Sequence, residues 1–148
     1  MIFESDLEDF EEEAPELPFA KDSDNISLEL DDYGAWFVDL QDHPADYDKK
    51  RMVFDGYLCS AYKNNVIHYG VGRVGMACCA DDMMFLGLSG TGAPFKKLNH
   101  MTNERKWGKV TGTIRVEYDK NGEIDNLGIE VESFVEAKKP EDTIVYFN

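Results

Sequence analysis

Two thiols and two carboxylates gather in the stretch Arg73-Val74-Gly75-Met76-Ala77-Cys78-Cys79-Ala80-Asp81-Asp82, the part of the sequence best suited to chemistry. Thiolates and carboxylates together form a donor set that zinc or another transition metal accepts. His68 precedes Cys78 by ten residues on the same predicted strand and adds an imidazole. We therefore take Cys78, Cys79, Asp82 and His68 as candidate metal ligands.

The spacing of the two cysteines also fits a structural role. Neighbouring residues on a strand point to opposite faces, so both thiols reach one metal only if the strand ends there. In the alternative, one cysteine packs as a small hydrophobe and the other lies near the surface. Arg73 is expected to orient a carboxylate by hydrogen bonding, which makes Arg73, Cys78, Cys79 and Asp82 the candidate ligand-binding residues.

A catalytic cysteine would need a neighbouring base and a group that orients this base. No motif ties any of the three histidines, His43, His68 and His100, to a cysteine. The glycine-rich loop 89–94 lacks the pattern of a phosphate-binding loop. We therefore expect no catalytic residues and a protein that is not an enzyme.

The charge balance narrows the classes of partner. The chain of 148 residues has 15 Lys and Arg against 30 Asp and Glu, a net charge of −15. Nucleic-acid binders normally show a basic footprint, so nucleic acid is not an expected partner. The sequence contains no long apolar run and no secretory signal, so we expect no direct membrane insertion and, for the chain as written, a cytoplasmic location.

The acidity is concentrated at the start of the chain. Residues 1–32 hold 13 acids and one base, Lys21, whereas residues 33–148 are close to neutral. With few aliphatic residues and two prolines, residues 1–24 are predicted to form a flexible acidic leader, because they bury too little apolar surface to offset the entropy of ordering. Residues 25–148 are predicted to form a single domain.

Period-two alternation dominates this domain and predicts strands, whereas Trp36, Phe37 and Leu40 lie at helical spacing before Pro44. The expected elements, in order, are a strand over 26–30, a helix over 33–42, strands over 52–59, 66–76 and 83–88, a helical turn within 95–101, strands over 107–118 and 127–135, and a last strand over 144–147. This order predicts a mainly β fold: an OB-like five-stranded antiparallel barrel with an N-terminal helix and one short helical or loop insertion. An open antiparallel sheet or a sandwich is the alternative.

A family resemblance covers about four-fifths of the chain. It rests on four places in order and on a similar ending: the Trp36-Phe37 helix before Pro44 and Tyr47; Val53-Phe54-Asp55-Gly56-Tyr57; Arg73-x-x-Met76-x-Cys78-Cys79-Ala80-x-Asp82 followed by Gly87-Leu88; Trp107-x-x-Val110-x-Gly112-x-Ile114; and Pro140 to Tyr146. From about Ser27 to Phe147, the chain resembles the soluble C-terminal domain of the YcgQ-type permease-subunit family of bacteria.

The resemblance implies an OB-like domain of unassigned activity that works beside a membrane permease, with a link to metal handling. That family carries transmembrane helices before this domain, and here only the acidic leader precedes it. If the domain is excised from a membrane-anchored protein, the resemblance implies an extracytoplasmic location instead of a cytoplasmic one.

Three functions follow from these patterns. The first is a non-enzymatic binding or accessory module for a metal ion or a protein partner, associated with a permease, with zinc or another transition metal as the candidate cofactor. The second is a pure protein-interaction domain with structural cysteines, whose acidic leader docks on a basic partner. The third is an OB-fold binder of single-stranded nucleic acid, which the charge disfavours.

Overall fold

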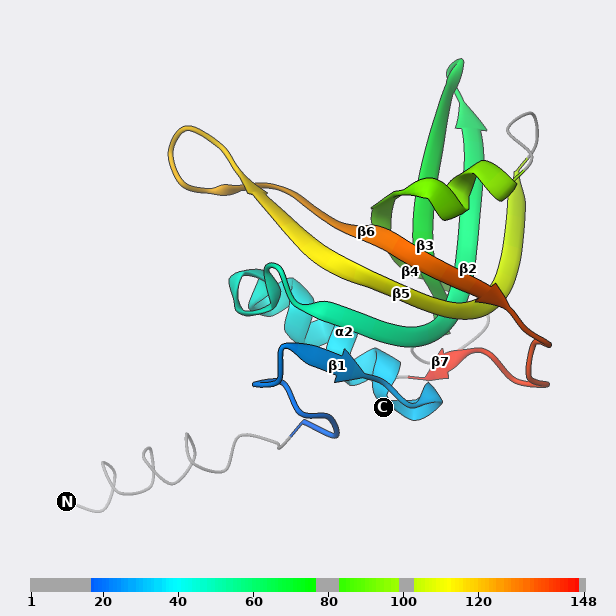
Figure 1. The fold of residues 1–148 in the computed structure, drawn as a ribbon, viewed down its shortest axis with the longest axis horizontal. Helices are drawn as coiled ribbons and strands as arrows, with labels where there is room; N and C mark the ends of the chain where they lie inside the picture. Colours follow the sequence, from blue (N-terminus) through cyan, green and yellow to red (C-terminus); the bar gives the residue numbers. More distant parts are fainter. Residues whose placement is uncertain (1–16, 77–82, 99–102, 147–148) are drawn as a thin grey trace.

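The computed structural model describes residues 17–76, 83–98 and 103–146, and its architecture is mainly β as predicted (Figure 1). The elements, in chain order, are β1 (Asn25–Ser27), the 3-10 turn η1 (Leu30–Asp32), α2 (Tyr33–Asp42), the 3-10 turn η2 (Pro44–Tyr47), β2 (Arg51–Lys63), β3 (Val66–Met76), β4 (Met84–Thr91), the 3-10 turn η4 (Ala93–Lys97), β5 (Glu104–Tyr118), β6 (Ile124–Glu136) and β7 (Val145–Tyr146).

Five of these strands close into the predicted OB-like barrel. Strand β2 pairs with β3 and β5, β3 pairs with β4, and β5 pairs with β6, all antiparallel. The ring closes through β4 and β6, and this pair is parallel. The barrel is therefore mixed and not wholly antiparallel, because direction cannot alternate all the way around a ring with an odd number of strands.

Two short strands extend the sheet beyond the ring. Strand β1 lies parallel to β2, and β7 lies parallel to the end of β3. Strand β1 begins one residue before the predicted first strand and ends three residues earlier, and β7 lies within the predicted last strand; both are shorter than predicted. The C-terminal strand matters for the site below, because Val145 and Tyr146 pair with Gly75 and Met76 of β3.

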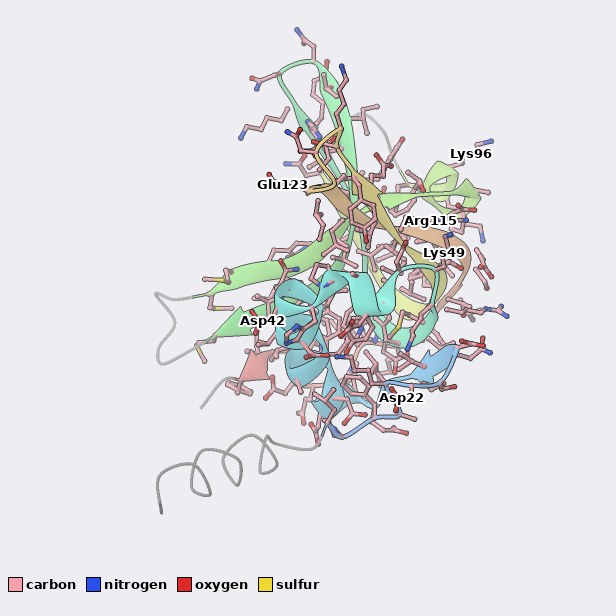
Figure 2. All side chains as sticks on the ribbon, turned by 90° about the vertical axis from the view of Figure 1, so that its left-hand side faces the viewer. Asp22, Asp42, Lys49, Lys96, Arg115 and Glu123 are labelled. Atoms are coloured by element: carbon pink, nitrogen blue, oxygen red, sulfur yellow. The ribbon has the colours of Figure 1, made fainter. Side chains whose placement is uncertain are left out.

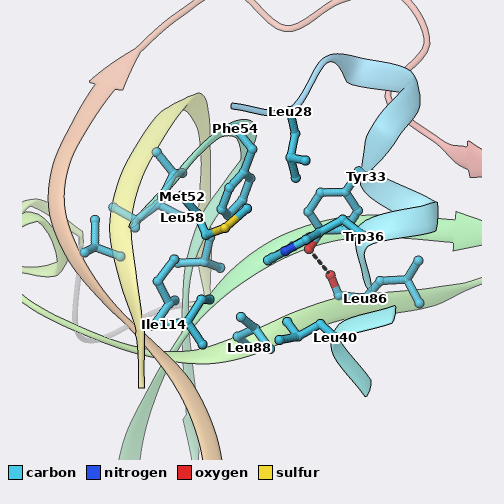
Figure 3. Close-up of a cluster of buried hydrophobic side chains, with 14 of the residues drawn as sticks. Leu28, Tyr33, Trp36, Leu40, Met52, Phe54, Leu58, Leu86, Leu88 and Ile114 are labelled. Atoms are coloured by element: carbon cyan, nitrogen blue, oxygen red, sulfur yellow. Dashed lines mark hydrogen bonds between the residues drawn. The ribbon is translucent and has the colours of Figure 1, made fainter. Parts of the chain in front are cut away.

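Helix α2 packs its apolar side on the barrel, as its spacing predicts. Tyr33, Trp36 and Leu40 are buried on this side, and the Tyr33 hydroxyl donates a hydrogen bond of 2.6 Å to the carbonyl oxygen of Leu86 (Figure 3). The ring of Trp36 lies 5.3 Å from that of Phe54 in the barrel interior. Burial of these large rings joins the N-terminal helix and the barrel into one core.

Two long hairpins reach away from α2. The turn between β2 and β3 is formed by Asn64 and Asn65, both with positive φ angles, as a tight hairpin turn requires. The turn between β5 and β6 contains Gly122 at φ 79°, which confirms the predicted Asn-Gly hairpin. In Figure 2, Glu123 marks this second turn and Asp42 the end of α2; both hairpins extend away from α2 in Figures 1 and 2.

The described end of the predicted leader, residues 17–24, contacts the domain. Phe19 packs against the core cluster. The ammonium of Lys21 lies 2.7 Å from a carboxylate oxygen of Asp39 on α2 and 3.0 Å from one of Asp46 in η2. Within the described part of the chain, no helix has the length and apolar character needed to cross a membrane.

Candidate functional site

Three predicted site residues, Cys78, Cys79 and Asp82, lie outside the described residues. His68 and Arg73 are described, and both belong to β3. The described residues include no group of three or more His, Cys, Asp or Glu side chains that could hold a metal ion. The predicted metal site therefore stays a prediction that depends on the segment between β3 and β4.

His68 lies near the hairpin end of β3, opposite Ala61 of β2. Met76, the last residue of β3, lies at the other end and pairs with Tyr146. Met76 is eight residue steps from His68 along the strand, which corresponds to about 26 Å of extended chain. The structure thus places the histidine at the opposite end of β3 from the residues that lead into the cysteine pair.

Arg73 is almost fully buried, with 3% of its surface exposed, and its hydrogen bonds go to the main chain. Its Nε and Nη2 donate to the carbonyl oxygen of Thr143 at 3.3 and 3.0 Å, and its Nη1 donates to that of Leu30 at 2.6 Å. The guanidinium also lies over the rings of Tyr33, at 5.4 Å, and Trp107, at 5.8 Å. These contacts tie the C-terminal segment and the turn before α2 to the barrel.

The same arginine lines a cleft of about 520 Å³ between the start of α2 and β7, together with Asp31, Asp142 and Tyr146. Burial lowers the pKa of Arg73, and the charges of Asp31 and Asp142 act in the opposite direction. In the described part of the chain, no carboxylate forms an ion pair with Arg73. The predicted carboxylate contact therefore has no counterpart among these residues.

A second hollow, which we call the sheet groove, lies on the outer face of β2, β3 and β4 and has a volume of about 600 Å³. Strand register explains which side chains meet there. Cys59 is opposite both Gly70 of β3 and Arg105 of β5, and Ala61 is opposite His68, so these side chains share one face of the sheet. The lining residues are Cys59, Ser60, Ala61, His68, Tyr69, Gly70, Phe85, Asn103 and Arg105.

Glycines make the floor of the sheet groove shallow and smooth. A Cβ at Gly87 would collide with the ring of Phe85, so this ring can lie across the sheet only because residue 87 has no side chain. The same ring reaches toward Gly70, where a Cβ would stand 3.9 Å from Phe85 Cε2. Phe85 remains 44% exposed, so its ring offers apolar surface to solvent within the groove.

Among the described residues that line the sheet groove, Arg105 is the one lysine or arginine, and none is an Asp or Glu. Burial raises the pKa of Cys59 to about 11, and the nearby charge of Arg105 only partly offsets this effect. Its thiol is therefore protonated at neutral pH. Arg105 lies over the ring of Tyr57 at 5.0 Å.

Sequence reasoning identified His68 but missed the groove around it. Alternation along β2 places Cys59 and Ala61 on one face of that strand, and alternation along β3 places His68 and Gly70 on one face of the other. Which of these sides face each other depends on register, and register depends on where the hairpin turns. The Asn64–Asn65 turn is the signal that pairs Ala61 with His68, because these two residues lie at equal distances before and after it.

Comparison with known proteins yields one match. A search of curated proteins found no match, and a search of solved structures found none. A model of the family described as the DUF1980 C-terminal domain matches residues 5–147. The match confirms the expected relationship to a C-terminal domain family of unassigned activity, and the association with a permease stays a prediction. Because the match covers nearly the whole sequence, the chain belongs to the DUF1980 C-terminal domain family.

Proposed function

We propose that this domain is a non-enzymatic binding module that recognises a protein partner through the sheet groove. The observation that carries the proposal is the exposed, glycine-floored apolar hollow around Phe85 on β2, β3 and β4. The face of the second and third barrel strands, here β3 and β4, is also the one on which OB folds bind oligonucleotides and oligosaccharides. An exposed apolar ring set in a hollow gives a partner a contact whose burial is favourable.

A protein segment suits this groove better than single-stranded nucleic acid. Binders of single strands follow the phosphate backbone with a row of basic residues and carry strongly positive grooves. Here Arg105 is the only lysine or arginine in the described lining, and the whole chain has a net charge of −15. The resemblance to a permease-subunit domain adds a source for the segment, namely a loop of a membrane permease.

Panning of a random 12-residue peptide library, displayed on phage, tests the proposal and needs no assumption about the identity of the partner. The bait is the full chain, beside a Gly70→Leu variant that fills the groove. Residue 70 tolerates a side chain, because its Cβ would stand 3.4 Å from the nearest backbone atom, the carbonyl oxygen of Leu88. Ser133→Leu, at an exposed position of β6, adds the same side chain away from the groove.

The proposal requires peptides that bind the wild-type chain and Ser133→Leu but not Gly70→Leu. Peptides retained equally by all three proteins would show binding elsewhere. Failure to enrich any peptide would remove the protein-binding proposal. Circular dichroism spectra of the three proteins verify that each variant keeps its β structure.

A metal-linked function is the second candidate, supported by the position of the β3 and β4 ends. Gly75 and Met76 pair with Val145 and Tyr146, which line the cleft that also contains Asp31 and Asp142. The chain leaves β3 at this cleft just before Cys78 and Cys79. Carboxylates near a pair of thiols would favour a divalent cation.

Metal content tests this second candidate. Mass spectrometry on untagged protein should find near-stoichiometric zinc, or another transition metal, that is lost from a Cys78→Ala, Cys79→Ala double variant. Because the thiols must lose protons to bind, affinity should weaken as the pH falls. Absence of metal after reduction and addition of zinc would leave the cysteines with a structural role.

A further inference from the structure

We propose that the segment recognised by the sheet groove is acidic and aromatic: a large apolar side chain packs on Phe85, and a carboxylate pairs with Arg105. This inference rests on the proposed function and specifies the chemistry of the partner. It follows from two features of the groove: a cation at one side, which forms no ion pair within the described part of the chain, and an exposed ring at the other.

The cation is unusual among the four arginines of the chain. Arg51 and Arg115 pair with Glu132 and Glu130 at 3.3 and 3.0 Å, and Arg73 donates to carbonyl oxygens. Arg105 forms no ion pair with the residues that the structure describes. In a chain with twice as many acids as bases, an exposed arginine that forms no ion pair with the described residues suits a carboxylate from a partner.

Contacts within the domain hold this arginine in place. The guanidinium of Arg105 lies 5.0 Å from the centre of the Tyr57 ring, and Tyr57 in turn packs edge-on against Trp107 at 5.0 Å. Both rings are nearly buried. A side chain positioned in this way loses less freedom when it pairs with a carboxylate, which strengthens binding.

The apolar half of the groove is equally well defined. The ring of Phe85 lies over Gly87, and the neutral thiol of Cys59 separates it from Arg105. A second ring laid on Phe85 would bury apolar surface and gain from ring packing. Because the described lining contains no carboxylate, an acid that pairs with Arg105 would meet no like charge within the groove itself.

Strand spacing sets the separation of the two contacts. Arg105 is opposite Cys59, and Cys59 is opposite Gly70, beside which the Phe85 ring lies. Two inter-strand steps correspond to about 10 Å, and an extended peptide covers that distance in about three residues. The bound segment should therefore carry its aromatic residue and its acid about three positions apart.

The sequences of the groove-dependent phage peptides test this inference, with Arg105→Glu as an added bait. Peptides with an aromatic residue and an acid about three positions apart should bind the wild-type chain, and their affinity for Arg105→Glu should be about tenfold lower. Panning on Arg105→Glu should enrich basic aromatic peptides instead. Lys120→Glu, in the exposed turn after β5, makes the same change in net charge and should leave binding unchanged.

The outcomes separate this inference from the proposed function. Groove-dependent peptides that lack an acid, or that bind Arg105→Glu as well as wild type, would overturn the inference and leave the binding module intact. Failure to obtain any groove-dependent peptide would overturn both. Retention of a dT12 oligonucleotide by the wild-type chain but not by Gly70→Leu would also overturn it, in favour of nucleic acid.

Discussion

Replacement of Arg73 by methionine tests whether this residue is a structural anchor. The guanidinium donates to the carbonyl oxygen of Thr143 in buried hydrogen bonds and to that of Leu30 in a partly buried one, and it lies over two aromatic rings. Methionine keeps a long apolar stem and removes every donor. The two carbonyl groups would then be left without these partners, that of Thr143 in a buried position and that of Leu30 at the edge of the cleft.

The expected loss follows from these contacts. A hydrogen bond that involves a charged group contributes about 1.5–3 kcal/mol, and a buried acceptor left unsatisfied costs about 1–3 kcal/mol. Relief from burying a guanidinium offsets part of this loss. We expect Arg73→Met to lower the free energy of unfolding by about 2–4 kcal/mol, and the melting temperature of a domain of this size by roughly 5–15 °C.

Urea denaturation followed by circular dichroism measures the loss, and amide hydrogen exchange locates it. Exchange should accelerate first at Val145 and Tyr146, because their pairing with β3 depends on the segment that Arg73 holds. Arg73→Lys should recover only part of the stability, since an ammonium cannot reproduce the planar set of donors. A change below about 0.5 kcal/mol for Arg73→Met would refute the anchor and favour a ligand-binding role, for which stability is often sacrificed.

Three further predictions concern single contacts. With its pKa near 11, Cys59 should react slowly with iodoacetamide at pH 7, and the rate should rise about tenfold per pH unit up to that value; rapid labelling at pH 7, seen by mass spectrometry, would contradict its burial. Burial alone would raise the pKa of Asp39, but its hydrogen bonds, among them that from Lys21, and the nearby positive charges together outweigh burial and lower that pKa below its ordinary value of 3.8. Lys21→Met should therefore lower the free energy of unfolding by roughly 1 kcal/mol at pH 6, as measured by urea denaturation. This difference should vanish as the pH falls through the lowered pKa of Asp39. The buried indole nitrogen of Trp36 has no hydrogen-bond partner among the described residues, so Trp36→Phe should cost only about 1 kcal/mol against about 3–5 for Trp36→Ala in thermal melts; similar costs for the two would reveal a partner for the N–H.

The main elements of the fold could be predicted because local patterns decide them. Trp36, Leu40 and Pro44 specify the helix and its end, and the Asn-Gly pair before Glu123 specifies a hairpin. Strand directions within each hairpin follow from these turns. The parallel pairing of β4 with β6 does not, because it joins strands distant in sequence and arises only when the ring closes.

The candidate site was harder to predict for the same reason. Arg73 stands in a motif that suggested ligand chemistry, yet its described partners, Leu30 and Thr143, are 43 and 70 residues away in sequence. Nothing local to Arg73 indicates that two main-chain carbonyls will reach it. The sheet groove likewise depends on three strand registers and on missing side chains at Gly70 and Gly87, which local alternation does not reveal.

The alternation of side chains along β3 explains how this strand contributes both to the sheet groove and to the anchoring contacts of Arg73. Gly70 and Gly72 share the face of the sheet groove, because they are opposite Cys59 and Tyr57, whereas Arg73, next in sequence, points to the other face. The anchor and the groove therefore use adjacent residues on opposite faces of β3. They are linked through Tyr57 and Trp107, because Arg105 lies over Tyr57, Tyr57 packs against Trp107, and Arg73 lies over Trp107. Substitutions at Gly70 or Arg105 should change recognition while the bonds to Thr143 persist, so loss of peptide binding in those variants can be separated from loss of the fold.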